Sequence, residues 1–507
     1  MAKKIIIIGG GLSGLTSGIY CIDNGYDVEI YEKNPIPGGE CTGWYREGNY
    51  IDGCAHWIVG TNPKSDLYPL WKHIGAFDEH TKIYPAEYLT VFQTPHGDLV
   101  FDADFHKLED EMLRRYPEDT KPIKKMFRTI RHYQTVRIPV KKPLEQMNPF
   151  SLMAFGIPML PMALSMQKYK RINLNHYCER FKNPDLSYVL KRFLEGNYSS
   201  HSLFYVLQTF ARGDAGVPEG GSLKMMLRVA EHYRSLGGKL YLNTPVKKIV
   251  TEGKKATGVL LENGRFVAAD YVISAVDMHY ALYDLLGGKY KDEFYHFRFQ
   301  NRLDYPYSAG FLLSYKVTSD VSSFPKMYDV LTKPISFFGE TIDHYAIRNF
   351  SFDPSLKGKD GSTLLTVLLP AKENAYDTIK QLSHEEYEAQ KEALGETFRQ
   401  RIAEDYPVPL DSIRCIDVTT PITYERYGNA YRGSYMAFLT TENAKGFMHN
   451  GRVKGLNNVI LSGQWIMPPG GLPVALFVGK HAAAKIAKLD HQKFRDLTDY
   501  SSWKKSS

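Results

Sequence analysis

Four consecutive isoleucines, Ile5 to Ile8, run directly into a glycine-rich turn close to the N-terminus. A short and uninterrupted apolar run of this kind is typical of a parallel strand that is buried on both faces. Gly9, Gly11 and Gly14 follow it in the spacing GxGxxG. The first glycine allows a tight turn, the second allows a pyrophosphate to approach the backbone, and the third allows the helix to pack closely on the strand. We therefore predict a strand, a phosphate loop and a helix whose N-terminus receives phosphate.

A second strand is predicted for YDVEIYE, residues 26–32, and it ends in a carboxylate. Glu32 lies 18 residues after Gly14, at a place where a carboxylate can accept hydrogen bonds from both hydroxyls of a ribose. Gly38 and Gly39 then form a second glycine pair, and no second GxGxxG occurs in the chain. The sequence therefore predicts one dinucleotide site and no separate NAD(P)H domain.

Two distant segments have the pattern of further pieces of the same domain. Residues 216–277 predict a loop, a helix, a strand, a hairpin with an Asn263-Gly264 turn and a buried strand. Residues 457–489 predict a buried strand, a loop rich in proline and glycine, and a helix from about Val474. The start of that helix presents free backbone N–H groups and a positive dipole end, which suit the electron-rich edge of a reduced flavin.

Composition and charge exclude several classes of protein. With 507 residues, 43% of them hydrophobic, the chain can bury a large core spread over two or more domains. The net charge of +7 is small for this size, so no nucleic-acid partner is expected. The five cysteines form no CxxC pair. We therefore expect a reducing compartment, with neither a disulfide framework nor a metal site.

One uncharged run of 22 residues, residues 146–167, lies between basic flanks. Its prolines at 149, 158 and 161 predict an interrupted helix rather than a continuous lipid-embedded one. Upstream, residues 121–143 carry eight basic and no acidic side chains, and the first five recur at the spacing of a basic amphipathic helix. The stretch favours an element seated in an anionic membrane surface, and a buried core or oligomer contact and a true membrane span are the alternatives.

Taken together, the chain resembles the phytoene desaturase, carotenoid isomerase and retinol saturase family of FAD-dependent oxidoreductases. The resemblance covers nearly the whole chain, through GxGxxG with Glu32 and the stretches GNYIDGCAHW, PEGGS, TPITYERYGN and GQWIMPPGGLPVA. It implies an α/β fold, namely a two-dinucleotide-binding-domain flavoprotein with a discontinuous Rossmann-like FAD domain and an inserted α+β substrate domain. The expected parts are the FAD domain at residues 1–75, 205–280 and 421–490, a membrane-contacting helical insert at 76–204, the substrate domain at 281–420 and a C-terminal tail at 491–507.

The resemblance also implies which residues hold the FAD. The ADP half would be held by Gly9, Gly11, Gly14, Glu32, Gly38 and Gly39, with the adenine at the backbone of Val246. The flavin end would be lined by Gly463, Gln464, Gly471, Leu472 and Pro473.

Three further positions near the expected flavin and pyrophosphate are interpreted by the same resemblance. His56 and Trp57 fall where the family's chain passes near the isoalloxazine ring, and His56 is a candidate for proton handling or, alternatively, a structural histidine. Glu40 stands where the family usually has Arg near the pyrophosphate. Either Lys33 or Arg46 compensates for its charge, or FAD binds more weakly than usual.

An enzyme of this family acts on long apolar polyenes or isoprenoid lipids. We therefore expect a cytoplasmic protein that contacts the membrane peripherally through residues 121–171 and desaturates its substrate by hydride transfer to flavin N5. The alternatives are isomerisation or saturation by reduced FAD, flavin amine oxidation, and non-catalytic prenyl binding of the GDP-dissociation-inhibitor type. The sequence leaves the substrate, the electron acceptor and the oligomeric state open.

Overall fold

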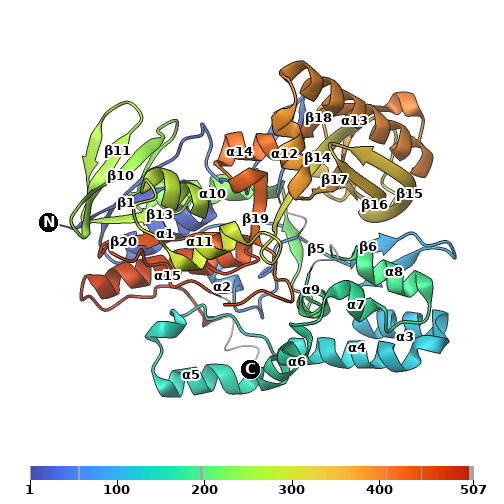
Figure 1. The fold of residues 1–507 in the computed structure, drawn as a ribbon, viewed down its shortest axis with the longest axis horizontal. Helices are drawn as coiled ribbons and strands as arrows, with labels where there is room; N and C mark the ends of the chain where they lie inside the picture. The colour runs from blue at the N-terminus through green and yellow to red at the C-terminus, as the bar shows by residue number, and fades with distance from the viewer. Residues whose placement is uncertain (1, 55–56, 195–197, 407, 447, 502–507) are drawn as a thin grey trace.

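The computed structural model of the chain describes residues 2–54, 57–194, 198–406, 408–446 and 448–501. Figure 1 shows three regions: a sheet flanked by α1, α10 and α15, a larger sheet with α12 and α13 beside it, and a set of helices that includes α3 to α9 along one edge. The chain passes back and forth among these regions, so each of the two sheets is built from separate stretches of sequence.

A five-stranded parallel sheet forms the core of the first region. Its order is β20-β13-β1-β2-β9, and the isoleucine run forms the central strand with Ile5, Ile6 and Ile7 fully buried. The strands are β1 (Lys4–Ile8), β2 (Asp27–Tyr31), β9 (Lys239–Tyr241), β13 (Tyr271–Ser274) and β20 (Val459–Leu461). Because β2 and β13 lie on opposite sides of β1, the strand order changes direction at β1, and ligands of such sheets bind beyond the carboxyl end of this strand.

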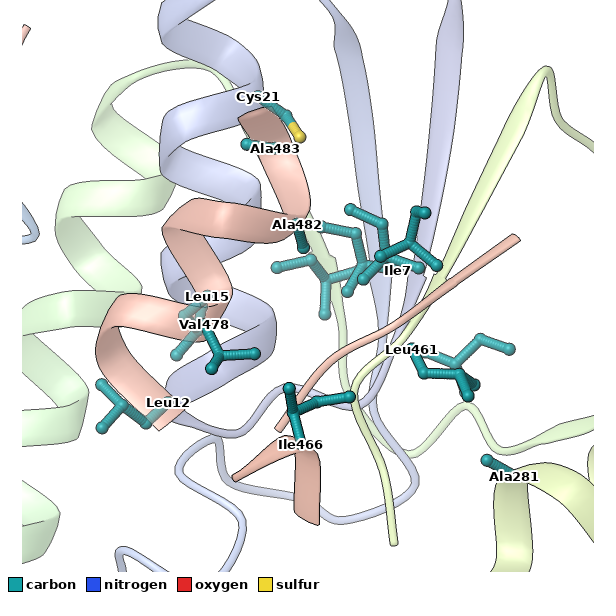
Figure 2. Close-up of a cluster of buried hydrophobic side chains, with 14 of the residues drawn as sticks. Ile7, Leu12, Leu15, Cys21, Ala281, Leu461, Ile466, Val478, Ala482 and Ala483 are labelled. Atoms are coloured by element: carbon teal, nitrogen blue, oxygen red, sulfur yellow. The ribbon is translucent and has the colours of Figure 1, made fainter. Parts of the chain in front are cut away.

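Three helices pack around this sheet: α1 (Leu12–Asp23), α10 (Gly221–Ser235) and α15 (Leu472–Leu489). α1 and α15 approach each other at backbone distance because Gly479 has no side chain; a Cβ there would lie 2.7 Å from the carbonyl oxygen of Ser13. Ser17 Oγ donates a hydrogen bond to the carbonyl of Gly479 at 3.1 Å. Figure 2 shows the apolar side chains, among them Ile7 and Val478, that fill the space between these helices and the sheet.

A three-stranded antiparallel sheet follows α10 and β9. It consists of β10 (Val246–Glu252), β11 (Lys255–Leu261) and β12 (Phe266–Ala268). The predicted Asn263-Gly264 turn joins β11 to β12, and Gly264 has the left-handed φ of 85° that such a turn requires. The single predicted hairpin is therefore part of a longer meander.

The second region is an eight-stranded mixed sheet. Its main order is β18-β14-β17-β16-β15-β6-β7, and β19 pairs with β14. The apolar runs YSAGFLLSYKV and TLLTVLLPA form the long strands β14 and β17. The bounds are β6 (Tyr88–Phe92), β7 (Leu99–Asp102), β14 (Tyr307–Val317), β15 (Met327–Phe337), β16 (Glu340–Asn349), β17 (Thr363–Ala371), β18 (Ile413–Thr419) and β19 (Ser434–Phe438).

Helices α12 (Glu373–Gln381), α13 (His384–Asp405) and α14 (Pro421–Gly428) accompany this sheet. α13 is rich in charged residues, and it begins with a capping box in which Ser383 and Glu386 satisfy each other's backbone N–H groups. Residues 281–300 form a π-helical turn (Tyr280–Leu285) and α11 (Glu293–Gln300).

The third region contains most of the helices of residues 76–204. Its elements are α3 (Phe105–Arg115), α4 (Thr120–Tyr133), α5 (Pro149–Gly156), α6 (Leu160–Tyr169), α7 (Leu174–Cys178), α8 (Pro184–Arg192) and α9 (His201–Ala211). The prediction of a purely helical insert is wrong, because its first residues form strands: β6 and β7 extend the eight-stranded sheet, and β5 (Ile83–Pro85) pairs with β8 (Gly216–Pro218). The remaining elements are the β3 (Gly43–Arg46) and β4 (Asn49–Asp52) hairpin and α2 (Tyr68–His73).

Two smaller expectations are also corrected. α15 begins at Leu472 rather than near Val474, because proline is tolerated in the first turn of a helix. The predicted interruption of the uncharged run is present as a 3₁₀ turn at Ile157–Met159 between α5 and α6, but the three elements continue as one helical stretch. The prolines of this stretch occupy the first turns of these three elements, where the missing N–H group costs nothing.

Candidate functional site

Only glycine fits at one position of the loop between β1 and α1 and at one position in the first turn of α1. Gly9 has a φ of 99°, and a Cβ there would lie 2.8 Å from the carbonyl oxygen of Ala275. A Cβ on Gly14 would lie 2.0 Å from the carbonyl oxygen of Gly9. Gly11 caps α1 without a side-chain hydrogen bond, and no acidic residue occupies the first turn. The N–H groups at the start of α1 therefore face the end of β1 without a side-chain acceptor, as a phosphate site requires.

Glu32 lies at the carboxyl end of β2 and is held toward this loop. Its Oε2 accepts a hydrogen bond from Gly10 N–H at 2.7 Å, and its Oε1 accepts one from Asn34 N–H at 2.8 Å. Burial raises the pKa of Glu32 above its usual value, while the two N–H groups oppose that rise. The carboxylate is thus fixed beside the phosphate loop, where a ribose would lie.

The second glycine pair closes the same side of the site. Gly38 N–H donates to the carbonyl of Gly10 at 2.9 Å, which forms a bridge between the two glycine-rich turns. A Cβ on Gly39, whose φ is 61°, would lie 3.2 Å from the Cα of Gly11. Gly9, Gly11, Gly14, Gly38 and Gly39 therefore lie close together, although they come from separate turns of the chain.

Val246 begins β10 and lies next to Glu32 in space. Val246 is buried. Two residues before it, Thr244 N–H donates a hydrogen bond to the carbonyl of Glu32 at 2.8 Å, which holds the start of β10 beside the end of β2. The structure therefore places the expected adenine contact and the expected ribose contact side by side.

The C-terminal segment reaches the phosphate loop from the opposite direction. The hydroxyls of Ser13 on α1 and Ser462 after β20 form a hydrogen bond of 2.7 Å. Gly463 and Gln464 follow, and α15 starts at the cap Gly471 with Leu472 and Pro473, without a side-chain cap or an acidic residue in its first turn. A second helix N-terminus therefore opens onto the same site.

Gln464 connects this segment to Glu40. Its Nε2 donates to Glu40 Oε2 at 2.7 Å, and its Oε1 accepts a hydrogen bond from Gly471 N–H at 3.0 Å. Burial, together with the nearby carboxylate of Asp277, raises the pKa of Glu40 to about 8, and the hydrogen bond from Gln464 opposes that rise. The raised pKa therefore favours the protonated, uncharged form of Glu40 at pH 7.

Of the two alternatives for Glu40, compensation by Lys33 or Arg46 finds no support in the structure. Lys33 Nζ donates to the carbonyl of Arg426 and to Asn429 Oδ1, at 2.9 and 2.7 Å. Arg46 pairs with Asp417 at 3.4 Å. Neither cation is directed at Glu40, and the uncharged amide of Gln464 takes that place.

Of the two aromatic candidates near the expected ring, one can be located. Trp57 packs edge-on against Phe210 of α9, with ring centroids 5.0 Å apart, at the border of the helical region. His56 lies outside the residues that the structure describes.

Two buried carboxylates of this site were not singled out in the sequence. Asp277 follows β13 and accepts hydrogen bonds from the N–H groups of His279, Tyr280 and Tyr431, and burial raises its pKa to about 6. Asp52 at the end of β4 accepts hydrogen bonds from both the N–H and the hydroxyl of Ser222, at 2.7 and 2.8 Å. The only sequence signal for either was its place at the end of a strand.

The helical stretch of residues 149–169 has an apolar surface that faces solvent. Pro149–Tyr169 is the one helical stretch of the described residues that is long and apolar enough, by length and composition, to cross a membrane, and only 11% of its most apolar window is buried. Its exposed side chains, with their exposed fractions, are Phe150 (83%), Met153 (59%), Ile157 (63%), Leu160 (56%) and Leu164 (65%).

Comparison with known proteins was made for the whole chain. Residues 12–487 match the family model described as flavin containing amine oxidoreductase. Among relatives, a lycopene-forming phytoene desaturase of Paracoccus sp. is 26% identical over 294 residues, which span 56% of this chain and 57% of that protein. A 4,4'-diapolycopene-forming 4,4'-diapophytoene desaturase of Methylomonas sp. is 20% identical over 520 residues, which span 100% of this chain and 99% of that protein.

The fold is also similar to solved structures. An oxidoreductase from Methanosarcina mazei has a TM-score of 0.60 at 18% identity, over 95% of this chain and 100% of that one. A putrescine oxidase bound to putrescine has a TM-score of 0.56 at 16% identity, over 96% of this chain and 99% of that one. At these identities the similarity concerns the fold alone.

Proposed function

Since this chain belongs to the family of flavin-containing amine oxidoreductases and is an FAD-dependent oxidoreductase, we propose that it desaturates a long apolar polyene or isoprenoid lipid taken from a membrane surface. The expected cofactor and fold class are confirmed by the family match and by the structural neighbours. The substrate and the direction of electron flow are the parts of this proposal that go beyond the family.

The residues at the carboxyl end of β1 fit FAD. Gly9, Gly14 and Gly38 allow close backbone packing that a Cβ would block, Glu32 is oriented by Gly10, and the N-terminus of α1 has no side-chain cap of its own. When bound there, FAD supplies the hydride acceptor at flavin N5. The protein positions the cofactor through backbone N–H groups and keeps Glu40 neutral through burial, so that its carboxyl group adds no negative charge beside the pyrophosphate.

The observation that supports a lipid substrate is the exposed apolar surface of α5 and α6. An amine oxidase that takes a small polar amine from water has no use for such a surface, whereas an enzyme that admits a polyene from a bilayer needs to lie on it. The exposed side chains Phe150, Ile157, Leu160 and Leu164 are large and apolar, and together they form a patch of the kind that marks lipid or protein contacts.

A basic surface accompanies the apolar one. On α4, the side chains of Lys121, Lys124, Lys125 and Arg128 are exposed, while Ile123, Met126, Phe127 and Ile130 are buried. α4 packs against α6, where His132 Nδ1 and Ser165 Oγ form a hydrogen bond of 2.9 Å, and α4, α6 and α5 follow one edge of the molecule in Figure 1. Clustered lysine and arginine next to an apolar helix favour a surface rich in anionic lipid, which supports peripheral membrane contact through residues 121–171 and a cytoplasmic location.

The test is an anaerobic titration of the FAD-loaded enzyme with a polyene presented in anionic vesicles. We expect the flavin absorption band to bleach and the product to be lighter by two hydrogens. If the polyene leaves the band intact but is isomerised or gains two hydrogens after the enzyme has been reduced, the site works as an isomerase or a saturase. Bleaching by putrescine or cyclohexylamine, with no response to the polyene, would instead identify an amine oxidase.

A variant separates substrate delivery from chemistry. Replacing Ile157, Leu160 and Leu164 together by glutamine is expected to abolish vesicle binding in a flotation assay, while a polyene offered in detergent still bleaches the flavin. A protein that floats as well as wild type after these substitutions would contradict the docking role of this surface. The charge-reversal variant Lys124→Glu with Arg128→Glu should weaken binding to anionic vesicles and leave binding to neutral ones unchanged.

A further inference from the structure

Cys41 and Cys54 face each other at the open end of the β3–β4 hairpin. The ladder of this hairpin pairs Gly43 with Asp52, and the N–H of Gly53 donates to the carbonyl of Thr42 at 3.1 Å, which continues it by one step. The next opposing positions are those of the two cysteines. Cys41 and Cys54 themselves lie at bends just outside the ladder, and a disulfide needs Cβ atoms about 3.5–4.5 Å apart.

The two thiols are already in contact. Cys54 and Cys41 are within hydrogen-bonding distance of each other, and this contact, together with burial, raises the pKa of the Cys54 thiol well above its usual value. Both cysteines are free, Cys41 is buried at 1% exposure, and Cys54 is half-buried. The two thiols therefore lie in contact, and Cys54 is the more exposed residue of the pair.

Each cysteine is hydrogen-bonded toward a different part of the candidate cofactor site. Cys41 N–H donates to the carbonyl of Gly38 at 3.1 Å, and Gly38 in turn binds the phosphate loop at Gly10. Cys54 N–H donates to Asp52 Oδ1 at 3.1 Å, and Asp52 holds Ser222 at the start of α10. A bond between the two sulfurs would join the phosphate-loop side of the site to the α10 side.

We propose that Cys41 and Cys54 form a reversible disulfide that makes the wall of the FAD site respond to the thiol redox state of the cell. The oxidant is a small disulfide. The Cys54 thiol, the more exposed of the two, first loses its proton to solvent, attacks the oxidant as the thiolate, forms a mixed disulfide and releases one small thiolate that takes up a proton; the Cys41 thiolate, formed in the same way, then displaces the second small thiolate and closes the Cys41–Cys54 bond. Overall, two cysteine thiols lose two hydrogens and the oxidant gains them, and an excess of a small dithiol reverses the reaction.

The other cysteines provide internal controls. Cys21 lies on α1, Cys178 on α7 and Cys415 on β18. Of the five thiols, only Cys41 and Cys54 should therefore form a disulfide, and the other three should stay free.

The experiment uses the FAD-loaded enzyme, equilibrated anaerobically with oxidised glutathione, quenched in acid and unfolded before thiols are counted. We expect the five free thiols to fall to three, peptide mapping to find Cys41 linked to Cys54, and dithiothreitol to restore all five. Five remaining thiols, or glutathione on Cys54 with Cys41 still free, would overturn the proposal. The result does not depend on the substrate or on the reaction direction.

Two variants sharpen the test. Cys41→Ser should lose the link and leave Cys54 as a mixed disulfide with glutathione, whereas Cys415→Ser should form the link as wild type does and fall from four thiols to two. The role of the link in the cofactor site is read from the rate of FAD release, followed by flavin fluorescence on dilution. We expect slower release from the linked form and recovery with dithiothreitol; equal rates for the two forms would overturn the claim that the link acts on the cofactor.

Discussion

The phosphate loop and the helical stretch of α5 and α6 are opposite cases within one chain. Around Gly9 and Gly14, backbone atoms approach so closely that a single added carbon has no space, and the residues of α1 are almost all buried. Along α5 no residue is buried, and a Cβ on Gly156 would meet nothing within 4 Å. Steric contacts inside the protein determine the phosphate loop. The helical stretch of α5 and α6 instead presents side chains that folding alone does not require.

Substitutions at the two places should therefore affect different properties of the protein. At the phosphate loop the stability of the folded state and the binding of the cofactor depend on the same contacts, so a substitution should weaken both. On α5 and α6 the exposed apolar side chains contribute little to folding, because they are in water in the folded and the unfolded chain alike. Their effect should appear only when a lipid surface is present.

The largest expected effect is that of Gly14→Ala. The new Cβ would lie 2.0 Å from the carbonyl oxygen of Gly9, so the backbone of the loop has to move. Overpacking of this kind costs about 1–3 kcal/mol, and we expect FAD affinity, measured by fluorescence titration, to fall by about tenfold to a hundredfold.

The matched control is Gly156→Ala in α5. Nothing lies near its Cβ, and alanine favours a helix over glycine by about 0.5–1 kcal/mol. We expect unchanged FAD affinity and equal or higher stability. Equal losses in the two glycine variants would break the contrast between the regions.

The next effect is that of Glu32→Gln, which keeps the shape of the side chain and removes its charge. Hydrogen bonds to a charged group contribute about 1.5–3 kcal/mol, so we expect FAD affinity to fall by about tenfold or more in the same titration. Glu29→Gln on the same strand is the control, because Glu29 pairs with Lys4 at 3.0 Å away from the cofactor loop. That variant should lose stability and retain FAD affinity; the reverse pattern would contradict the ribose role of Glu32.

A smaller effect is expected for Glu40→Gln, and it depends on pH. The pKa of Glu40 is raised from 4.5 to about 8 in the folded protein. Between these two values the unfolded chain has released the proton while the folded protein retains it, so this group's contribution to stability is present below pH 4.5 and lost as the pH rises through 8. Wild type should therefore lose stability relative to Glu40→Gln between pH 5 and pH 8.

Denaturant unfolding of both proteins at the two pH values measures this difference. We expect an advantage of the variant at pH 8 on the order of 1 kcal/mol or more, since one unit of pKa shift corresponds to about 1.4 kcal/mol. A stability difference that is the same at pH 5 and pH 8 would show that Glu40 titrates normally.

The smallest effect on stability is expected for Ile157, Leu160 and Leu164 replaced together by glutamine. Because these side chains are more than half exposed, the free energy of unfolding should change by no more than about 0.5 kcal/mol. The control on the same helix is Met162→Gln, whose side chain is buried at 8% exposure and whose replacement should cost about 2 kcal/mol or more. A large loss in the triple variant would mean that its surface is covered within the folded protein.

Much of the fold could be predicted from local patterns. The strand at Ile5 to Ile8, the following helix, the strands β14 and β17 and the charged helix α13 all have periodicities or caps that are complete within about 25 residues. The strands of residues 76–102 were missed because they are short and lie beside a region rich in helical signals. Their strand character comes from pairing with β15, which is more than 200 residues away.

The candidate site was predictable to the same extent. The spacing of the glycines and Glu32 has one steric explanation. The structure places these residues close together. Their roles in binding the cofactor remain predictions. For Glu40, the alternative of a compensating cation was based on charge alone and is not supported, and the alternative of weaker FAD binding stays a prediction. The partner of Glu40, Gln464, is 424 residues away, and the protonation of Glu40 follows from burial beside Asp277.

The sequence by itself determined the strand, phosphate loop and helix, the cofactor class and the existence of an uncharged stretch between basic flanks, because each depends on residues that are neighbours along the chain. Only the tertiary structure decided that this stretch is exposed, that Glu40 is neutral and that Cys41 meets Cys54. These properties depend on how separate segments pack, since packing sets both the distance between groups and their access to water, and no local pattern encodes either.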